Sequence, residues 1–219
     1  GNMNDVACAV GVSLLLTAAW WPAHSARGLL SPGGRCFAFD ASADGHVRGE
    51  AVGCAVLAAR PERLADGQQA LDDLVTLGRI CGARALTNGA AASLTTPRGP
   101  AEQALLLDAC RASGIQGSDV DLVECHAAGT LLADAAEVSS TRHALRAGVR
   151  APLLLGSCKS SLGNTMAANG LVSLHRMMYQ LQSGVICSNL HLRGLNPQIH
   201  SEGHTPALMH SEVVDSMLM

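Results

Sequence analysis

The sequence LLLGSCKSSLGNT, residues 153–165, joins a short apolar run to a polar loop of small residues. The apolar run, 153–158, predicts a buried strand. Residues 165–183 beyond the loop predict a helix, because Gly184 supplies a stop signal directly after them. A strand, a polar loop and a helix in this order form the repeating unit of an α/β fold built from layered sheets and helices.

The same order of elements occurs on the N-terminal side of this unit. Residues 120–125 (VDLVEC) predict a short strand, and residues 134–148 predict the helix that follows it. Residues 100–114 predict another helix, with Pro100 at its start and Gly114 as its stop. The second half of the chain is therefore expected to be α/β throughout.

Two longer apolar runs lie near the N-terminus. Residues 6–16 (VACAVGVSLLL) predict a buried strand, followed by a short helical piece that ends near Arg27. Residues 51–59 (AVGCAVLAA) predict a second buried strand. Residues 61–67 (PERLADG) have the composition of a linker, and a second set of α/β elements is expected from 68–77 onward.

The composition excludes several classes of function. The 219 residues are 48% hydrophobic and 15% charged, which is enough apolar surface for a folded core and excludes disorder for most of the chain. Fifteen Lys and Arg residues against eighteen Asp and Glu residues give a net charge of −3, and only 2% of the residues are aromatic. Without a basic surface or aromatic rings for base stacking, no nucleic-acid partner is expected.

The cysteine and histidine spacing gives no metal signature. The eight cysteines are never closer than fifteen residues, which favours buried, reduced thiols in an intracellular protein, in the cytoplasm or an organelle such as a plastid. His200 and His204 stand four apart, but Gly203 and Pro206 oppose a helix there, so no metal is expected.

One uncharged segment is long enough to be tested as a membrane span. Residues 6–23 contain no charge, but Gly11, Ser13, Thr17 and Pro22 interrupt the segment. A buried strand followed by a short helix explains it better. Membrane contact is therefore not expected.

Three polar loops follow predicted strands and could carry chemistry, because open α/β sheets place their sites beyond the carboxyl ends of strands. The first loop contains acidic residues that either cap a turn or support a site. The second has a histidine that leaves a buried strand, followed by acidic residues at a helix start. The third has a lysine that needs a partner, for which Glu137 is the candidate. The candidate residues are Asp40, Asp44 and Glu50, then His126, Thr130, Asp134 and Glu137, then Lys159 and Asn164.

Two cysteines adjoin these loops and are candidates for a nucleophile. Cys125 and Cys158 each stand inside a strand-like run and not at an exposed helix N-terminus, where the pKa of a thiol would be lowered. Neither is expected to act as a nucleophile.

Taken together, the loops resemble the second half of a β-ketoacyl synthase, the condensing domain of fatty acid and polyketide synthases. The segment GLLSPGGRCFAFDASADGHVRGEAVG is similar to the family run "mLSpdGrc.aFDa.adGyvrGEG.g". The segments ECHAAGTLLADAAE and GSCKSSLGNTMAANG are similar to "E.HGTGT.lGDp.E" and "gs.KsniGHtegAaG". The resemblance extends from Gly1 to about Ile199, with SLTTPRGPAEQALLLDACRASGI and NLHLRGLNPQI also matching in order.

The resemblance implies a thiolase-like fold, in which two similar α/β halves stack as helix, sheet, helix, sheet, helix. In that fold, residues 1–60 are the end of the N-terminal half, residues 61–200 are most of the C-terminal half, and residues 201–219 form a divergent tail. The fold is then incomplete in this chain, and a homodimer or the remainder of the ketosynthase fold is the implied partner.

The family reaction is decarboxylative Claisen condensation of acyl and malonyl thioesters on acyl carrier protein. No separate cofactor is implied, since phosphopantetheine on the carrier protein holds the substrates. The resemblance makes His126 the first family histidine, Lys159 the ordering lysine and Glu137 its acidic neighbour. The second family histidine falls on Asn164, whose amide can donate a hydrogen bond but cannot shuttle a proton.

Two functions stay open at this point. The nucleophilic cysteine of the family has no match in the chain and is expected to precede Gly1, so condensation requires a cysteine-bearing segment from elsewhere. Alternatively, the chain is a catalytically degenerate ketosynthase-like subunit of a larger assembly, an interpretation that Asn164, Ala127, Ala128 and the altered C-terminus favour.

Overall fold

A computed structural model describes residues 6–58, 75–91, 93, 96–200 and 207–215 of the chain. The helices are α1 (Trp20–Ser25), α2 (Gly99–Ser113), α3 (Leu131–Leu145), α4 (Lys159–Leu162), α5 (Asn169–Ser183) and α6 (Pro197–His200), with 3-10 turns at Gly117–Asp119 and Met166–Ala168. The strands are β1 (Val6–Ser13), β2 (Ala51–Ala58), β3 (Leu122–Glu124), β4 (Leu153–Gly156), β5 (Val185–Ile186), β6 (Ala207–Leu208) and β7 (Val214–Asp215).

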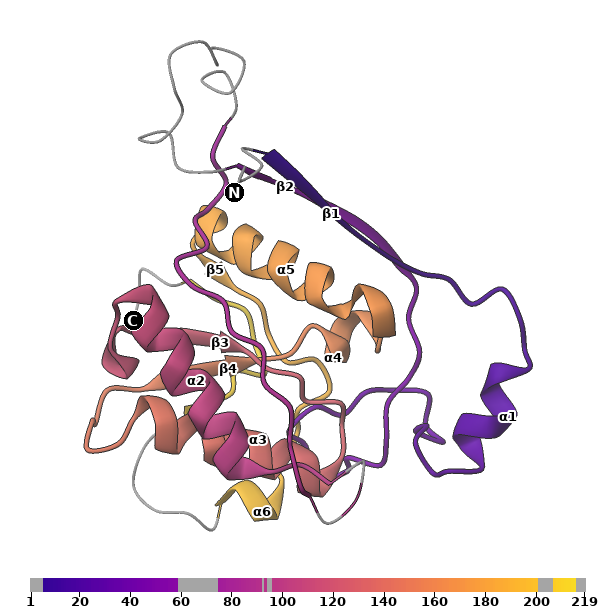
Figure 1. Cartoon of the computed structure of the whole chain (residues 1–219). Coiled ribbons are helices and arrows are strands. Elements are labelled where there is room, and N and C mark those ends of the chain that lie inside the picture. Colours follow the sequence, from indigo (N-terminus) through magenta and orange to yellow (C-terminus); the bar gives the residue numbers. More distant parts are fainter. Residues whose placement is uncertain (1–5, 59–74, 92, 94–95, 201–206, 216–219) are drawn as a thin grey trace.

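The described elements form alternating layers of sheet and helix. Strands β1 and β2 pair antiparallel over their whole length, while β3, β4 and β6 form a parallel sheet in that order. Helix α5 lies between these two sheets, and α2 and α3 cover the other face of the β3–β4–β6 sheet (Figure 1). The predicted α/β layering is therefore present.

Small residues allow α5 to approach the β1–β2 pair closely. Gly11 and Gly53 are directly opposite one another in the register and face α5. A Cβ atom on Gly11 would lie 3.0 Å from Leu171 Cδ1, and one on Gly53 would lie 3.4 Å from Leu171 Cβ. The two glycines thus leave the space that the leucine side chain fills.

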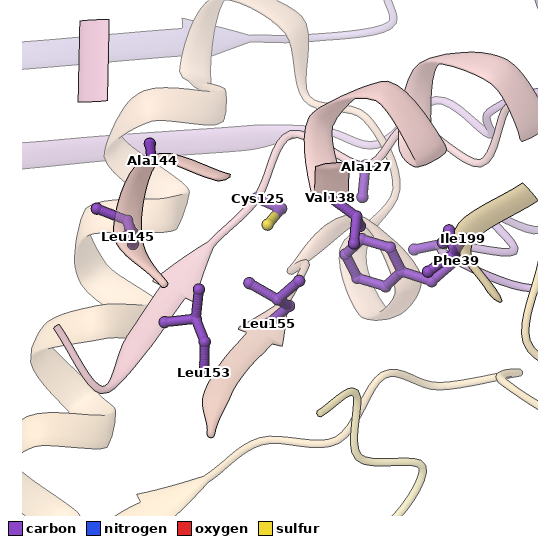
Figure 2. Close-up of a cluster of buried hydrophobic side chains, with 10 residues drawn as sticks. Phe39, Cys125, Ala127, Val138, Ala144, Leu145, Leu153, Leu155 and Ile199 are labelled. Atoms are coloured by element: carbon purple, nitrogen blue, oxygen red, sulfur yellow. The ribbon is translucent and has the colours of Figure 1, made fainter. Parts of the chain in front are cut away.

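The main hydrophobic core lies between the β3–β4 sheet and α3 (Figure 2). Leu153 and Leu155 alternate with Leu154 along β4, and all three are buried because helices cover both faces of the sheet. The aromatic ring of Phe39 packs beside Val138 and Ile199 in this core. The loop that begins near residue 39 is thereby fixed against α3.

Most predicted elements occur with shifted ends, and α3 shows why. The sequence predicts this helix over 134–148, but it spans Leu131–Leu145 because Asp134 is a residue of its first turn and not its first residue. The helix predicted from residue 165 begins at Asn169, after a 3-10 turn, and the short helix α4 is not predicted. Gly114 and Gly184 do end their helices, each in the left-handed conformation.

The remaining predictions fall on less regular segments. The linker 61–67 and most of 68–77 lie outside the described residues, and 75–89, including GRICGARAL, contains no helix or strand. Within the expected tail, β6 pairs with β4 and β7 pairs with β5. In the described part of the chain, no helix is long and apolar enough to cross a membrane.

Candidate active site

The three polar loops meet at the carboxyl ends of β3 and β4. The segment 44–49 connects them: Gly45 N–H donates to Gly129 O over 2.8 Å, and Asn164 N–H donates to Val47 O over 2.7 Å. Gly49 N–H donates in turn to Asn164 O over 3.1 Å. The 44–49 segment therefore fixes the loop that carries His126 relative to the loop that carries Asn164.

Lys159 and Glu137 hold the backbone around His126 from two sides. The Lys159 ammonium donates to the carbonyl oxygen of His126 over 2.6 Å. The Glu137 carboxylate accepts the N–H of His126 over 2.6 Å and the N–H of Ala127 over 2.8 Å. The predicted ion pair between Lys159 and Glu137 is therefore wrong. Both side chains bind the same stretch of backbone instead of each other.

Charged side chains are buried next to the loop that carries His126. Lys159 is 2% exposed and Asp134 is 1% exposed. Burial raises the pKa of Glu137, and the backbone N–H groups of Ala127 and His126 together with the Lys159 charge offset part of that rise. Burial likewise raises the pKa of Asp134. The Lys159 ammonium is thus the positive charge that offsets two buried acids.

Asp134 ties α3 to two of the loops. Its Oδ1 accepts the N–H of Thr130 over 3.2 Å, and its Oδ2 accepts the N–H of Phe39 over 3.1 Å. Thr130 is the N-cap residue of α3, but its side chain makes no capping hydrogen bond. Asp134 therefore takes the capping role from within the helix and links it to the residue before Asp40.

The His126 side chain is exposed above this support. Partial burial of the ring lowers its pKa to about 4, and the charge of Lys159 and the neighbouring His46 act in the same direction. His126 is consequently a neutral imidazole at pH 7, able to donate one hydrogen bond and accept one.

Asn164 is 4% exposed, and its side chain is partly engaged. The Oδ1 atom accepts the N–H of Met166 over 3.0 Å and the Asn169 Nδ2 group over 2.7 Å. The amide nitrogen is the part of this side chain that can still donate to a ligand. Asn164 is thus oriented by its own helix entry rather than by His126.

The acidic residues of the first loop have different surroundings. Asp40 accepts N–H groups from Ser42, Arg193 and Gly194 at 2.7, 2.7 and 3.0 Å. Burial alone would raise the pKa of Asp40, but these backbone donors outweigh it and lower the pKa. Asp40 therefore holds residues 193–194 to the first loop.

Asp44 and Glu50 support the loops from the surface. Asp44 is exposed and bridges Thr130 through its backbone. Glu50 is also exposed, and it accepts the N–H of Leu15 over 2.6 Å at the exit of β1. Both therefore contribute to the fold around the loops rather than to the surroundings of the His126 ring.

Cys125 and Cys158 are buried, and their environment opposes nucleophilic chemistry. Burial raises the pKa of both thiols, and the charge of Glu124 adds to the effect. Burial also raises the pKa of Cys36 to about 12, beside the carbonyl of Ala127. All three are protonated thiols and not thiolates at neutral pH.

Sequence reasoning missed two residues that support the site. Ser157 is fully buried, and its hydroxyl lies 3.4 Å from Ala127 O, while its N–H donates to Asn189 Oδ1 over 2.9 Å. Asn189 also donates to Leu155 O over 3.0 Å. Both act through backbone groups of distant segments, so neither stands out in the sequence. Within the described residues, no group of three His, Cys, Asp or Glu side chains is placed to hold a metal ion, and His204 lies outside them.

Two family models match the chain. The model for the β-ketoacyl synthase C-terminal domain matches residues 77–193, and the model for the β-ketoacyl synthase N-terminal domain matches residues 2–63. Together they cover most of the chain, with the unmatched residues 64–76 between them.

The curated relatives include polyketide synthases. The chain is 40% identical over 196 residues to a phenolphthiocerol/phthiocerol polyketide synthase of Mycobacterium bovis, covering 89% of the chain and 10% of that protein. It is 38% identical to the phthioceranic/hydroxyphthioceranic acid synthase of Mycobacterium tuberculosis, covering 90% of the chain and 9% of that protein. The chain spans about a tenth of the length of these relatives.

Solved structures agree with the family models. The ketosynthase from module 6 of the bacillaene synthase from Bacillus subtilis 168 superposes with a TM-score of 0.88 at 28% identity, over 97% of this chain and 37% of that one. An oxazolomycin ketosynthase domain of Streptomyces albus JA3453 gives a TM-score of 0.85 at 27% identity, over 96% and 36%. The thiolase-like fold is therefore confirmed for the chain. With its loops, its layers and these matches in agreement, the chain belongs to the β-ketoacyl synthase family.

Proposed function

We propose that this chain supplies the hydrogen-bond donors of a ketosynthase active site. That site catalyses decarboxylative Claisen condensation of acyl and malonyl thioesters. The observation that carries this proposal is the support of the His126 backbone by Lys159 on its carbonyl side and Glu137 on its amide side. Fixed donors aimed at a developing oxyanion stabilise such a transition state without reorganising during the reaction.

In this reaction a cysteine thiolate, supplied by a segment outside the 219 residues, takes the acyl group from its carrier. The malonyl thioester then loses CO₂, and the resulting enolate carbon attacks the acyl-enzyme carbonyl, expelling the thiolate. The neutral imidazole of His126 donates to the thioester oxygen as the enolate forms. The amide nitrogen of Asn164 supplies a second donor that holds no transferable proton.

A second candidate function is a degenerate, structural ketosynthase-like subunit. One observation favours it: Asn164 Oδ1 is already satisfied by Met166 and Asn169, so this side chain is held by its own helix entry. These contacts of Asn164 stabilise the helix entry whether or not the protein is catalytically active. Turnover decides between the two functions.

The test is condensation by the protein together with its cysteine-bearing segment, given acyl and malonyl thioesters of acyl carrier protein. We expect a β-ketoacyl product by mass spectrometry and its loss in His126→Ala. His143→Ala is the matched control, since His143 is a histidine in the last turn of α3, away from the loops. Unaltered turnover in His126→Ala would remove His126 from the mechanism. No turnover in the unaltered protein would favour the structural role.

The partners in this proposal are acyl carrier protein, the remainder of a ketosynthase fold or a second copy of the chain, and a larger synthase assembly. The domain division into 1–60, 61–200 and 201–219 is part of the same proposal, as is an intracellular location. A thiol within hydrogen-bond reach of both His126 and Asn164 in the assembled protein is the structural requirement. If no chain supplies such a thiol, condensation is excluded.

A further inference from the structure

Two asparagine side chains meet at the start of α5. Asn164 Oδ1 accepts the N–H of Met166 over 3.0 Å and an N–H of the Asn169 side-chain amide over 2.7 Å. Asn169 is the first residue of α5, five positions after Asn164. The two side chains therefore form one hydrogen-bonded pair that includes a candidate site residue.

The orientation of the Asn169 amide is set by a group that can act in only one direction. Asn169 Oδ1 accepts the backbone N–H of Thr165 over 2.9 Å and the Thr165 hydroxyl over 2.8 Å. A backbone N–H only donates, so the amide atom that faces it must be the oxygen. The other end of the amide is then Nδ2, and it donates to Asn164.

The orientation of the Asn164 amide is set in the same way. Its Oδ1 faces the backbone N–H of Met166 and the Nδ2 group of Asn169, which are both donors. Its backbone is occupied as well, since its N–H donates to Val47 and its carbonyl accepts from Gly49. Among the described residues, Nδ2 is the one polar atom of Asn164 without a hydrogen-bond partner.

We propose that Asn169 is a positioning residue that fixes Asn164 as a hydrogen-bond donor, with Oδ1 bound to α5 and Nδ2 left for the substrate oxygen. The role of Asn169 rests on the proposed function, in which Asn164 Nδ2 donates to the thioester oxygen. A free asparagine amide can present either its oxygen or its nitrogen, and the oxygen would repel a developing enolate oxyanion. Fixing the amide before the substrate binds removes the wrong orientation.

The sequence departs from the ketosynthase pattern at both positions of this pair. The family run "gs.KsniGHtegAaG", which resembles residues 156–170, has a histidine at the position of Asn164 and an alanine at that of Asn169. An alanine side chain can neither donate nor accept a hydrogen bond. The amide partner thus occurs in this chain together with the residue that it orients.

Asn169→Asp separates positioning from a purely structural role. The carboxylate can still accept from Thr165, and a negative charge is favourable at the start of a helix. However, it has no N–H for Asn164 Oδ1, and its second oxygen repels that atom. Asn169→Ala loses both sets of contacts. We therefore expect the lower melting temperature in Asn169→Ala and the lower kcat of condensation in Asn169→Asp.

The test is condensation by the protein together with its cysteine-bearing segment, given acyl and malonyl thioesters of acyl carrier protein. We expect kcat to fall about 10-fold in Asn169→Ala and about 100-fold in Asn169→Asp, the second being typical of one lost oxyanion donor. KM is expected to stay unchanged, because Asn169 acts only through Asn164. Asn88→Asp is the matched control, since it makes the same change at an exposed residue outside the helices and strands. Values of kcat that follow the melting temperatures would overturn the positioning role.

A second measurement decides the role of Asn169 without turnover. In protein labelled with ¹⁵N at asparagine, the Asn164 side-chain signal is identified by its loss in Asn164→Asp. We expect slow exchange with water for the side-chain amide protons of Asn169 and faster exchange for those of Asn164. In Asn169→Asp, the Asn164 N–H groups turn toward the new carboxylate, so their signal shifts and their exchange slows.

The two measurements distinguish failure of the positioning role from failure of the proposed function. An Asn164 side-chain signal that is the same in the unaltered protein and in Asn169→Asp overturns the positioning role, whether or not the protein condenses thioesters. A protein that shows the expected signals but no turnover loses the proposed function and keeps the fixed amide. Full turnover in Asn169→Asp leaves the proposed function intact and removes Asn169 from it.

Discussion

The Lys159 ammonium donates a hydrogen bond over 2.6 Å to the carbonyl oxygen of His126, a residue 33 positions earlier in the chain. Lys159 is the only lysine in the sequence, and it is almost completely buried. On the other side of the same peptide segment, Glu137 accepts two backbone N–H groups. The position of the histidine ring is thus set by charged side chains that bind its backbone.

Replacement of Lys159 by Met tests this support. The substitution keeps an unbranched apolar stem but removes the ammonium that donates to the carbonyl of His126 and the positive charge that offsets the acids Glu137 and Asp134. We expect the free energy of unfolding to fall by about 2–4 kcal/mol, measured by urea denaturation. Arg111→Met is the control, because Arg111 is an exposed cation on α2 whose ion pair with Asp108 contributes little. Equal small effects in both variants would contradict the supporting role of Lys159.

Much of the fold follows from local patterns in the sequence. The apolar runs 51–59 and 153–158 predict β2 and β4, and Gly114 and Gly184 mark helix ends because both adopt the left-handed conformation. The predicted start of α3 is wrong because an acidic residue is favourable throughout the first turn of a helix, so Asp134 does not mark the first residue.

The candidate site is only partly predictable. Motifs point to His126, Lys159, Glu137 and Asn164, but they do not show which groups these side chains bind. An ion pair between Lys159 and Glu137 is the natural expectation, since charge complementarity is visible in a sequence. Backbone carbonyls and amides are present at every position, so a sequence cannot show that a backbone segment is the shared partner.

The lowered pKa of His126 predicts a pH dependence of stability. Between about pH 6.5 and pH 4, the unfolded chain binds a proton at this histidine that the folded protein does not bind. Stability that this residue supports above pH 6.5 is therefore lost as the pH falls through that window. Glu137 and Asp134 act with the opposite sign, because burial raises their folded pKa values and favours proton uptake by the folded state.

The contribution of His126 is isolated by a difference measurement. We expect the unfolding free energy of His126→Gln to fall less between about pH 7 and pH 5 than that of the unaltered protein, since the two acids are shared by both. Chemical denaturation at several pH values measures the two curves. Parallel curves would show that the imidazole titrates alike in the folded and unfolded states.

Two glycines test the role of the 44–49 segment. A Cβ atom on Gly49 would overlap the carbonyl oxygen of Leu162, next to the turn that carries Asn164. We expect Gly49→Ala to displace this turn and to destabilise the protein by about 1–3 kcal/mol. Gly170→Ala is the matched control, because Gly170 lies in α5 with open space around its Cα, and alanine favours a helix. Urea denaturation compares the two variants. Equal stability of Gly49→Ala and Gly170→Ala would contradict the role of the 44–49 segment in holding the turn that carries Asn164.

Arg146 joins α3 to the loops that precede β3 and β4, although nothing in the sequence distinguishes it from exposed arginines. Its side chain is 2% exposed, and the guanidinium donates to the carbonyls of Gly117, Ala151 and Pro152 at 2.6, 2.9 and 2.9 Å. It also donates to Val120 O and Leu145 O. One cation thus satisfies carbonyls from three segments that must stay together for β3 and β4 to pair.

Arg146→Met is therefore expected to destabilise the protein by about 3–5 kcal/mol, because several buried carbonyls lose their donor at once. Arg150→Met is the control, since Arg150 is exposed in the loop that follows α3. Hydrogen exchange gives the sharper measurement: in Arg146→Met, the amide of Leu154, which donates to Asp121 O, should exchange faster than in the control. Unchanged protection of that amide would mean that strand pairing holds β3 and β4 together without the guanidinium, and that the buried arginine only fills space.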